Sequence, residues 1–197
     1  MKVTKAQVQE NRSRIVDAAS ALFRERGYDG VGVAELMAAA GFTHGGFYKH
    51  FRSKADLMAE AAAKGISQSV ANNGGLDFSE FVTYYLSRAH RDDRSAGCTI
   101  AALCGDAARQ SSDIKATFAG GIESSLTSFL RAGLRADKPD QNEDEEEARA
   151  TMIDTYAHVL GALMLSRACP DDSPLADEIL EVARKQIFKS LQPKKEN

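Results

Sequence analysis

Apolar residues recur along this chain at the three- and four-residue spacing of helices, and no segment alternates apolar and polar residues as a half-buried strand does. The first such segment carries five apolar residues on one helical face before Gly27 ends it: Ile15, Ala18, Ala19, Leu22 and Phe23. All four prolines lie in the last third of the chain. We therefore predict an all-α fold.

Eight further helices follow from the same spacing, with glycine, proline or capping residues between them. They cover residues 33–40, 43–51, 53–72, 77–90, 98–110, 113–134, 143–168 and 174–191. The second and third are short, and a tight turn around Gly41 separates them. Two short helices joined by such a turn and packed on a longer helix form a helix-turn-helix, a motif that places its second helix in the major groove of DNA.

The composition sets limits on what this fold can do. The longest stretch without Asp, Glu, Lys or Arg is the thirteen residues 36–48, and no apolar segment follows the N-terminus, so we expect no membrane span or secretion signal and a cytoplasmic protein. Three cysteines without a CxxC pattern predict neither a disulfide framework nor a metal site, and we expect no cofactor.

Charge is divided unevenly along the chain. Residues 1–64 hold 10 Lys and Arg against 7 Asp and Glu, whereas the remaining residues hold 15 against 21. A basic segment on an acidic body favours a polyanionic partner, although chance variation in a chain of mixed charge gives the same split. The acidic run at residues 143–147 is typical of a solvated helix start, where the helix dipole favours negative charge.

The second helix of the motif would present small and donor-rich side chains. Gly41 supplies the positive φ of the corner, Phe42 fills it, and Leu36, Met37, Phe47 and Phe51 bury the angle. The residues left to face a nucleic acid are Thr43, His44, Gly45, Lys49 and His50, with Tyr48 and Lys54 as phosphate donors. Gly45 and Gly46 together cost a helix about 2 kcal/mol relative to alanine. Either close approach to DNA or a frayed helix start explains them.

These residues resemble the DNA-binding head of the TetR/AcrR family over Arg12 to Leu57, about a quarter of the chain. The resemblance rests on Arg14-Ile15, Ala18-Ala19, Leu22-Phe23, Gly27-Tyr28, Val33, Ala40-Gly41, Gly45 through Phe51, Ser53-Lys54 and Leu57. It implies an N-terminal three-helix helix-turn-helix domain at 1–52 and a C-terminal helical effector-binding and dimerisation domain at 53–197. It also implies contacts with operator DNA, which Tyr48 and Lys54 would make through phosphates. The residues concerned are Thr43, His44, Gly45, Tyr48, Lys49, His50 and Lys54.

The chain departs from the family pattern before the second helix. Where the family usually has a pair of threonines, this sequence has Val31 and Gly32. One hydroxyl contact to phosphate is absent there, at a cost of about 1 kcal/mol. We expect Lys2, Lys5, Arg12 and Arg14 to compensate through their charge.

For the body, the resemblance implies an effector pocket in the middle helices and a homodimer through the last two. The apolar and aromatic residues that we assign to the pocket are Phe81, Tyr84, Tyr85, Cys98, Phe118, Ile122, Met152, Tyr156 and His158. No charge stands among them, so a neutral, aromatic or lipophilic small molecule is the favoured ligand. An ordinary protein core has the same aromatic and methionine composition.

The leading hypothesis is a repressor that a small-molecule effector releases from a palindromic operator on double-stranded DNA. The alternative is an all-α enzyme or ligand carrier with a vestigial helix-turn-helix. The sequence offers no set of catalytic residues other than Asp154, one helical turn before His158, so we expect no enzyme. An architectural DNA binder would carry more positive charge. A thiol sensor would act through Cys98, whose thiolate a helix N-terminus stabilises.

Overall fold

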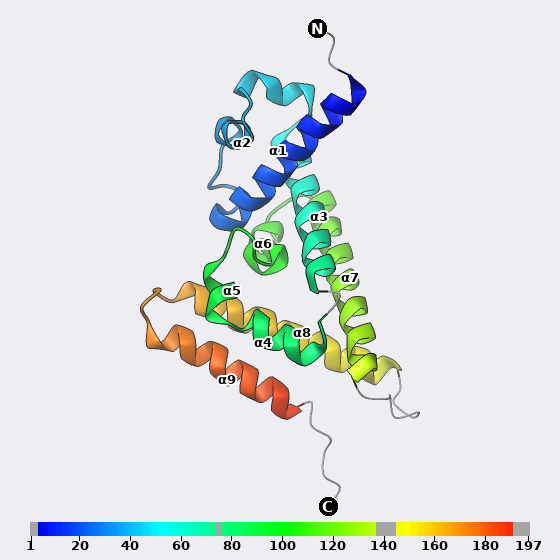
Figure 1. Cartoon of the computed structure of the whole chain (residues 1–197), viewed down its shortest axis with the longest axis vertical. Coiled ribbons are helices and arrows are strands. Elements are labelled where there is room, and N and C mark those ends of the chain that lie inside the picture. The colour runs from blue at the N-terminus through cyan, green and yellow to red at the C-terminus, as the bar shows by residue number, and fades with distance from the viewer. Residues whose placement is uncertain (1–3, 74–75, 137–144, 191–197) are drawn as a thin grey trace, which may run out of the picture. The chain divides into compact units, whose positions relative to one another are not determined.

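The computed structural model describes residues 4–73, 76–136 and 145–190, and every regular element in these ranges is a helix (Figure 1). The elements are α1 (Lys5–Arg26), α2 (Val33–Ala39), the 3₁₀ helix η1 (His44–Lys49), α3 (Lys54–Asn73), α4 (Phe78–Tyr85), α5 (Arg88–Asp92), α6 (Thr99–Ala107), α7 (Ser112–Ala136), α8 (Glu145–Ala168) and α9 (Pro174–Ser190). The all-α prediction is confirmed.

The chain forms two compact units. The first comprises Met1–Ser69 and Arg94–Ile122, and the second comprises Val70–Asp93 and Glu123–Asn197. Helices α3 and α7 each begin in one unit and end in the other. The first unit therefore contains α6 as well as the helix-turn-helix, so it extends beyond the 1–52 segment to which the sequence assigns DNA binding. That functional division stays a prediction.

Several predicted helix boundaries need correction. The predicted helix 77–90 is two helices, because Leu86 leaves the helical conformation and the Ser87 side chain accepts a hydrogen bond from the backbone N–H of His90, capping α5. The predicted helix 43–51 is the six-residue η1, and Thr43 stands at its N-cap without a side-chain hydrogen bond. Asp113 lies in the first turn of α7 instead of capping it.

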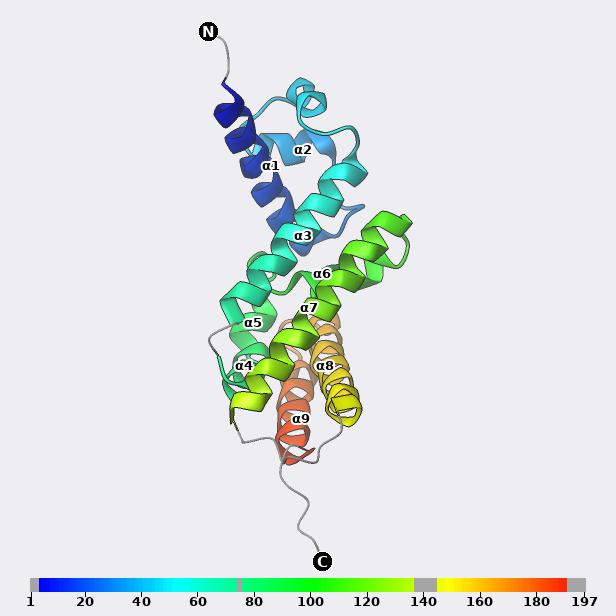
Figure 2. The ribbon, with the colours of Figure 1, turned by 90° about the vertical axis from the view of Figure 1, so that its right-hand side faces the viewer.

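Helices α1, α2 and α3 lie together in the first unit (Figure 2), and with η1 they contribute much of its buried core. Its fully buried members include Ile15, Ala19, Phe23, Leu36, Met37 and Leu57. Helix α6 contacts α1. Arg24 of α1 donates from Nε to the Ser95 carbonyl at 2.6 Å, and Asp106 of α6 accepts a 3.0 Å hydrogen bond from the Tyr28 N–H. These bonds join α6 and the segment before it to α1 and the loop that follows α1.

The second unit is built on α8 and α9, which lie side by side, with α4 in contact with both and α5 in contact with α8 (Figure 1). An aromatic cluster fills its interior. Phe81 and Phe129 have ring centroids 4.3 Å apart, and Phe129 and Tyr156 are 5.5 Å apart. Tyr85 adds a third aromatic contact, 5.1 Å from Phe81.

Candidate nucleic-acid interface

The corner of the helix-turn-helix is formed as the sequence predicts. Gly41 has φ +80°, a conformation that L side chains rarely adopt, and the Phe42 N–H donates to the Met37 carbonyl at 2.8 Å. Arg14 closes the corner from α1, with Nη2 3.1 Å from the Ala40 carbonyl and its guanidinium 5.0 Å from the centre of the Phe42 ring. These contacts hold η1 at a fixed angle to α2.

Two phenylalanines anchor η1 from beneath. Phe47 and Phe51 are buried, and their rings stack with centroids 5.6 Å apart. The prediction that both side chains belong to the core is confirmed. Because they face inward, most of the residues between and before them face solvent, although His50 is half-buried.

The exposed residues of this segment, which we call the η1 face, are Thr43, His44, Gly45, Tyr48 and Lys49. The Tyr48 ring is 72% exposed, an unusual position for an aromatic side chain with no partner protein or ligand. A hydroxyl, an imidazole, a phenol and an ammonium group thus stand on a six-residue helix and its N-cap. All five residues were singled out from the sequence.

Gly45 has no packing reason to be glycine. A Cβ built on it would meet nothing within 4 Å, and its φ is not among the positive ones of the described residues. At Gly46 a Cβ would make ordinary contact with Met37 Cε at 3.6 Å. The space over Gly45 is open to a molecule that approaches the η1 face.

His50 and Lys54 lie differently from the rest. The His50 ring is half-buried beside Phe42 and Phe51, and its buried Nδ1 has no hydrogen-bond partner among the described residues. Burial, helped by the charges of Arg12 and Lys49, lowers the pKa of His50 and so favours its neutral ring. Lys54 Nζ donates to the Tyr28 carbonyl at 2.5 Å. Its ammonium group thus has a partner within the protein, and its contact with a DNA phosphate stays a prediction.

Two arginines expected to compensate for the missing threonines are also engaged inside the first unit. Arg12 donates from Nε to Glu60 at 3.1 Å, donates to the His50 carbonyl, and places its guanidinium 4.2 Å from the centre of the Phe51 ring. Arg14 is bound at the corner. Spacing along the sequence cannot reveal such partners, because Glu60 lies 48 positions from Arg12.

Sequence reasoning missed one cation beside the η1 face. Arg52 is exposed and directly follows the buried Phe51. Its backbone N–H donates to the Asp56 carboxylate at 3.1 Å, while the Asp56 N–H donates to Ser53 Oγ at 3.1 Å, so the start of α3 has its own caps. The signal in the sequence was a basic residue between a core phenylalanine and a capping serine.

The nine effector candidates are divided between the two units. Cys98, Phe118 and Ile122 belong to the first unit and the other six to the second. Phe81, Tyr85 and Tyr156 are part of the buried aromatic cluster, Met152 is half-buried, and Tyr84 and His158 are exposed. An open groove of about 440 Å³ runs between α8 and α9, and His158 is the one candidate among its lining residues. The pocket assignment stays a prediction.

The thiol-sensor alternative through Cys98 stays a prediction. Cys98 occupies the N-cap of α6 but is buried, and burial raises the pKa of the half-buried Cys104 thiol. In the described ranges no three His, Cys, Asp or Glu side chains gather as metal ligands would. No helix in the same ranges has the length and apolar character needed to cross a membrane.

The helix-turn-helix segment is similar in sequence to part of several known proteins. The sequence profile described as "Bacterial regulatory proteins, tetR family" matches residues 15–61. The chain is 42% identical over 57 residues to the HTH-type transcriptional regulator AcrR of Shigella flexneri, a match that covers 29% of this chain and 26% of that protein. It is 40% identical over 58 residues to the HTH-type transcriptional repressor BepR of Brucella suis, covering 29% and 28%. The match thus spans about a quarter of these relatives' length.

Similarity of fold extends over nearly the whole chain. The reduced form of Escherichia coli NemR has a TM-score of 0.72 at 19% identity, covering 91% of this chain and 96% of that one. A transcriptional regulator of the TetR family from Agrobacterium tumefaciens has 0.73 at 18%, covering 92% and 98%. A TetR transcriptional regulator from Chloroflexus aurantiacus has 0.66 at 25%, covering 95% and 98%. These likenesses agree with an all-α fold along the chain.

Proposed function

We propose that this chain, a member of the TetR/AcrR family by its helix-turn-helix segment and its fold, is a sequence-specific DNA-binding regulator of transcription. The observation that carries the proposal is the η1 face, where exposed polar side chains stand on a short helix held by buried Phe47 and Phe51. A face of side-chain donors that form no hydrogen bond with the described residues suits the acceptor-rich edges of bases and phosphates. The protein would act in the cytoplasm and without catalysis.

The residues of this segment would make two kinds of contact with DNA, with base edges and with phosphates. Thr43, His44 and Gly45, at the start of η1, would approach base edges, and the bare Gly45 would let the backbone come close. Tyr48, Lys49 and Arg52 would contact phosphates, because they are exposed and carry donors or positive charge. Lys54 and His50 would act indirectly, through the contacts that hold the segment.

A homodimer through α8 and α9 would place two such faces on one palindromic operator. The support is an apolar surface on these helices. Ile153, Leu165, Leu175 and Val182 are between 46% and 62% exposed, and the last three line or border the open groove. Neighbouring exposed apolar residues on two adjacent helices are typical of a surface that a second protein covers.

Release by a small molecule is the regulatory part of the proposal. The aromatic cluster of the second unit, with Phe81, Tyr85 and Tyr156, suits a neutral aromatic or lipophilic effector. Such an effector would act by binding one of two conformations of the protein more tightly than the other. Which conformation it prefers would decide between repression and release.

Selection of bound DNA from a random-sequence library, with the purified full chain at near-physiological salt, tests the proposal. We expect enrichment of one palindrome. The matched control is the Tyr48→Ala, Lys49→Ala double variant, which removes two exposed side chains and should keep the fold while losing the enrichment. Absence of any enriched sequence with the wild-type chain would contradict sequence-specific binding.

A further inference from the structure

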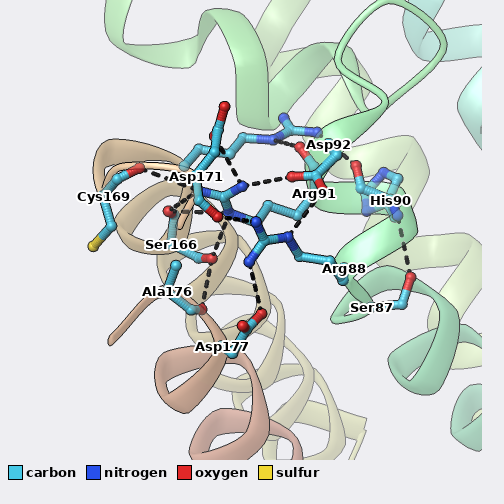
Figure 3. A network of polar contacts seen from close by, with 11 residues as sticks. Ser87, Arg88, His90, Arg91, Asp92, Ser166, Cys169, Asp171, Ala176 and Asp177 are labelled. Atoms are coloured by element: carbon cyan, nitrogen blue, oxygen red, sulfur yellow. Dashed lines mark hydrogen bonds and ion pairs between the residues drawn. The ribbon is translucent and has the colours of Figure 1, made fainter. Parts of the chain in front are cut away.

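Helix α5 carries an arginine that is buried almost completely, and its guanidinium reaches the end of α8 (Figure 3). Arg91 is 1% exposed. Its Nε donates to Ser166 Oγ at 3.0 Å, and its Nη2 donates to the carbonyls of Ser166 at 3.0 Å and Cys169 at 3.1 Å. Nη1 contacts the carboxylates of Asp92 at 2.5 Å and Asp171 at 3.1 Å. All three nitrogens of the guanidinium are therefore bonded.

The position of these acceptors explains the charge. Helix α8 ends at Ala168, and the last carbonyls of a helix lack intrahelical partners and form the negative end of its dipole. Arg91 supplies a C-terminal cap to α8 from another helix. Arg167 of α8 returns the contact by donating to the carbonyls of Arg91 at 3.0 Å and His90 at 2.9 Å.

Arg88, one helical turn earlier on α5, also binds the loop between α8 and α9 and reaches the start of α9. Its Nη1 is 2.9 Å from the carboxylate of Asp177 in the first turn of α9, and it also donates to the Asp171 carbonyl. Ser166 Oγ donates to the Ala176 carbonyl at 2.8 Å and joins α8 to α9 directly. Figure 3 shows the two arginines entering the α8–α9 turn from one side.

The bonded residues lie directly beside two exposed apolar ones. Ser166 and Ala176 are both fully buried, while their chain neighbours Leu165 and Leu175 are 62% and 52% exposed and line the groove. Apolar packing of α8 on α9 allows several sliding arrangements, whereas directional bonds to a planar guanidinium allow one. A buried arginine also carries a desolvation cost that an apolar residue would avoid, so stability alone is a weak reason for it.

We propose that Arg91 is a positioning residue for pairing of two copies of this chain. By capping α8 and holding Ser166 against Ala176, it fixes Leu165 and Leu175 in the arrangement that the second copy meets. This inference rests on the dimer proposed above. Dimerisation would then depend on a side chain that lies outside the paired surface.

The test compares the dimer dissociation constant of the full chain with those of Arg91→Met, Arg91→Lys and Ser166→Ala, measured by sedimentation equilibrium. The control is Leu126→Ala, which removes buried side-chain volume from α7 in the same unit, away from the turn. All are compared at a temperature where circular dichroism shows full helicity. We expect Arg91→Met to raise the dissociation constant at least about tenfold, a loss of about 1.4 kcal/mol of pairing free energy. Arg91→Lys should recover part of it, and Leu126→Ala should change it less than about twofold.

Three results would overturn the inference. If the wild type is a dimer and Arg91→Met and Ser166→Ala have the same dissociation constant as the wild type, the dimer stands but Arg91 has no role in it. If Arg91→Met and Leu126→Ala both weaken the dimer in proportion to the thermal stability that they lose, Arg91 has an ordinary structural role. A monomeric wild type would remove both the dimer and the inference. If Arg91→Met does not fold, Arg91→Lys and Ser166→Ala decide between these results.

Discussion

Lys54 donates a hydrogen bond from Nζ to the carbonyl oxygen of Tyr28, 2.5 Å away and 26 positions earlier in the chain. The bond joins the start of α3 to the loop after α1, and it places the ammonium 6.0 Å from the centre of the buried Phe23 ring. A cation that the sequence assigns to a DNA phosphate is therefore part of the internal hydrogen bonding of the first unit. Lys49, exposed on the η1 face, is not.

Lys54 and Lys49 should respond differently to removal. Lys54→Met should lower the free energy of unfolding by about 1 to 2 kcal/mol, because a buried carbonyl loses a charged donor, and should leave the salt dependence of DNA binding unchanged. Lys49→Ala should leave stability unchanged and reduce the slope of log Kd against log salt by about 0.9. Urea unfolding and binding titrations at several salt concentrations measure both. A reduced slope in Lys54→Met would return that residue to the phosphate contacts.

Gly45→Ala should separate the two explanations of the glycine pair. Because nothing in the described part of the chain lies within 4 Å of a Cβ at this position, the change should leave stability the same or raise it by up to about 1 kcal/mol. If backbone approach to DNA requires the glycine, operator affinity should fall at least about tenfold, which corresponds to about 1.4 kcal/mol. Gly41→Ala is the contrasting variant: its φ of +80° should make it destabilising by about 1 to 3 kcal/mol. Unchanged affinity in Gly45→Ala would favour the frayed helix start.

Arg12→Ala should loosen the helix-turn-helix. The side chain joins Glu60, the His50 carbonyl and the Phe51 ring, so its loss should lower the free energy of unfolding by about 1 to 3 kcal/mol. Hydrogen exchange should increase at η1 and leave α8 and α9 protected. Arg26→Ala, which breaks the exposed pair with Glu35, is the control and should cost about 0 to 1 kcal/mol. Equal effects of the two variants would refute a special role for Arg12.

Stability should decrease in mildly acidic solution because of His90. Burial lowers the pKa of this ring, although its Nδ1 lies 2.8 Å from the Tyr85 carbonyl, a contact that favours the protonated form. The unfolded chain then binds a proton near pH 6.5 that the folded chain binds only at lower pH. The stabilisation is complete above about pH 6.5 and is lost as the pH falls toward the folded pKa, by at most about 1.4 kcal/mol per pH unit. Urea unfolding between pH 7.5 and 5 should show a shallower pH dependence in His90→Asn than in the wild type.

Local patterns in the sequence determined much of this protein. Helical spacing and capping residues act within a few positions of each other, so they identified the helices, the Gly41–Phe42 corner, and Phe47 and Phe51 as core. With the core assigned, exposure of Thr43, His44, Gly45, Tyr48 and Lys49 followed, because residues between inward positions on a short helix face outward.

The tertiary structure alone decided where the charged and polar side chains point. Arginines are mostly exposed in folded proteins, but Arg91 is buried against Ser166, 75 positions away. Arg12 and Lys54 likewise find partners on other helices. Long flexible side chains can reach either solvent or a carbonyl on a neighbouring element, and the choice depends on which elements pack together. That packing is set by contacts between residues distant in the chain, which spacing and composition do not encode.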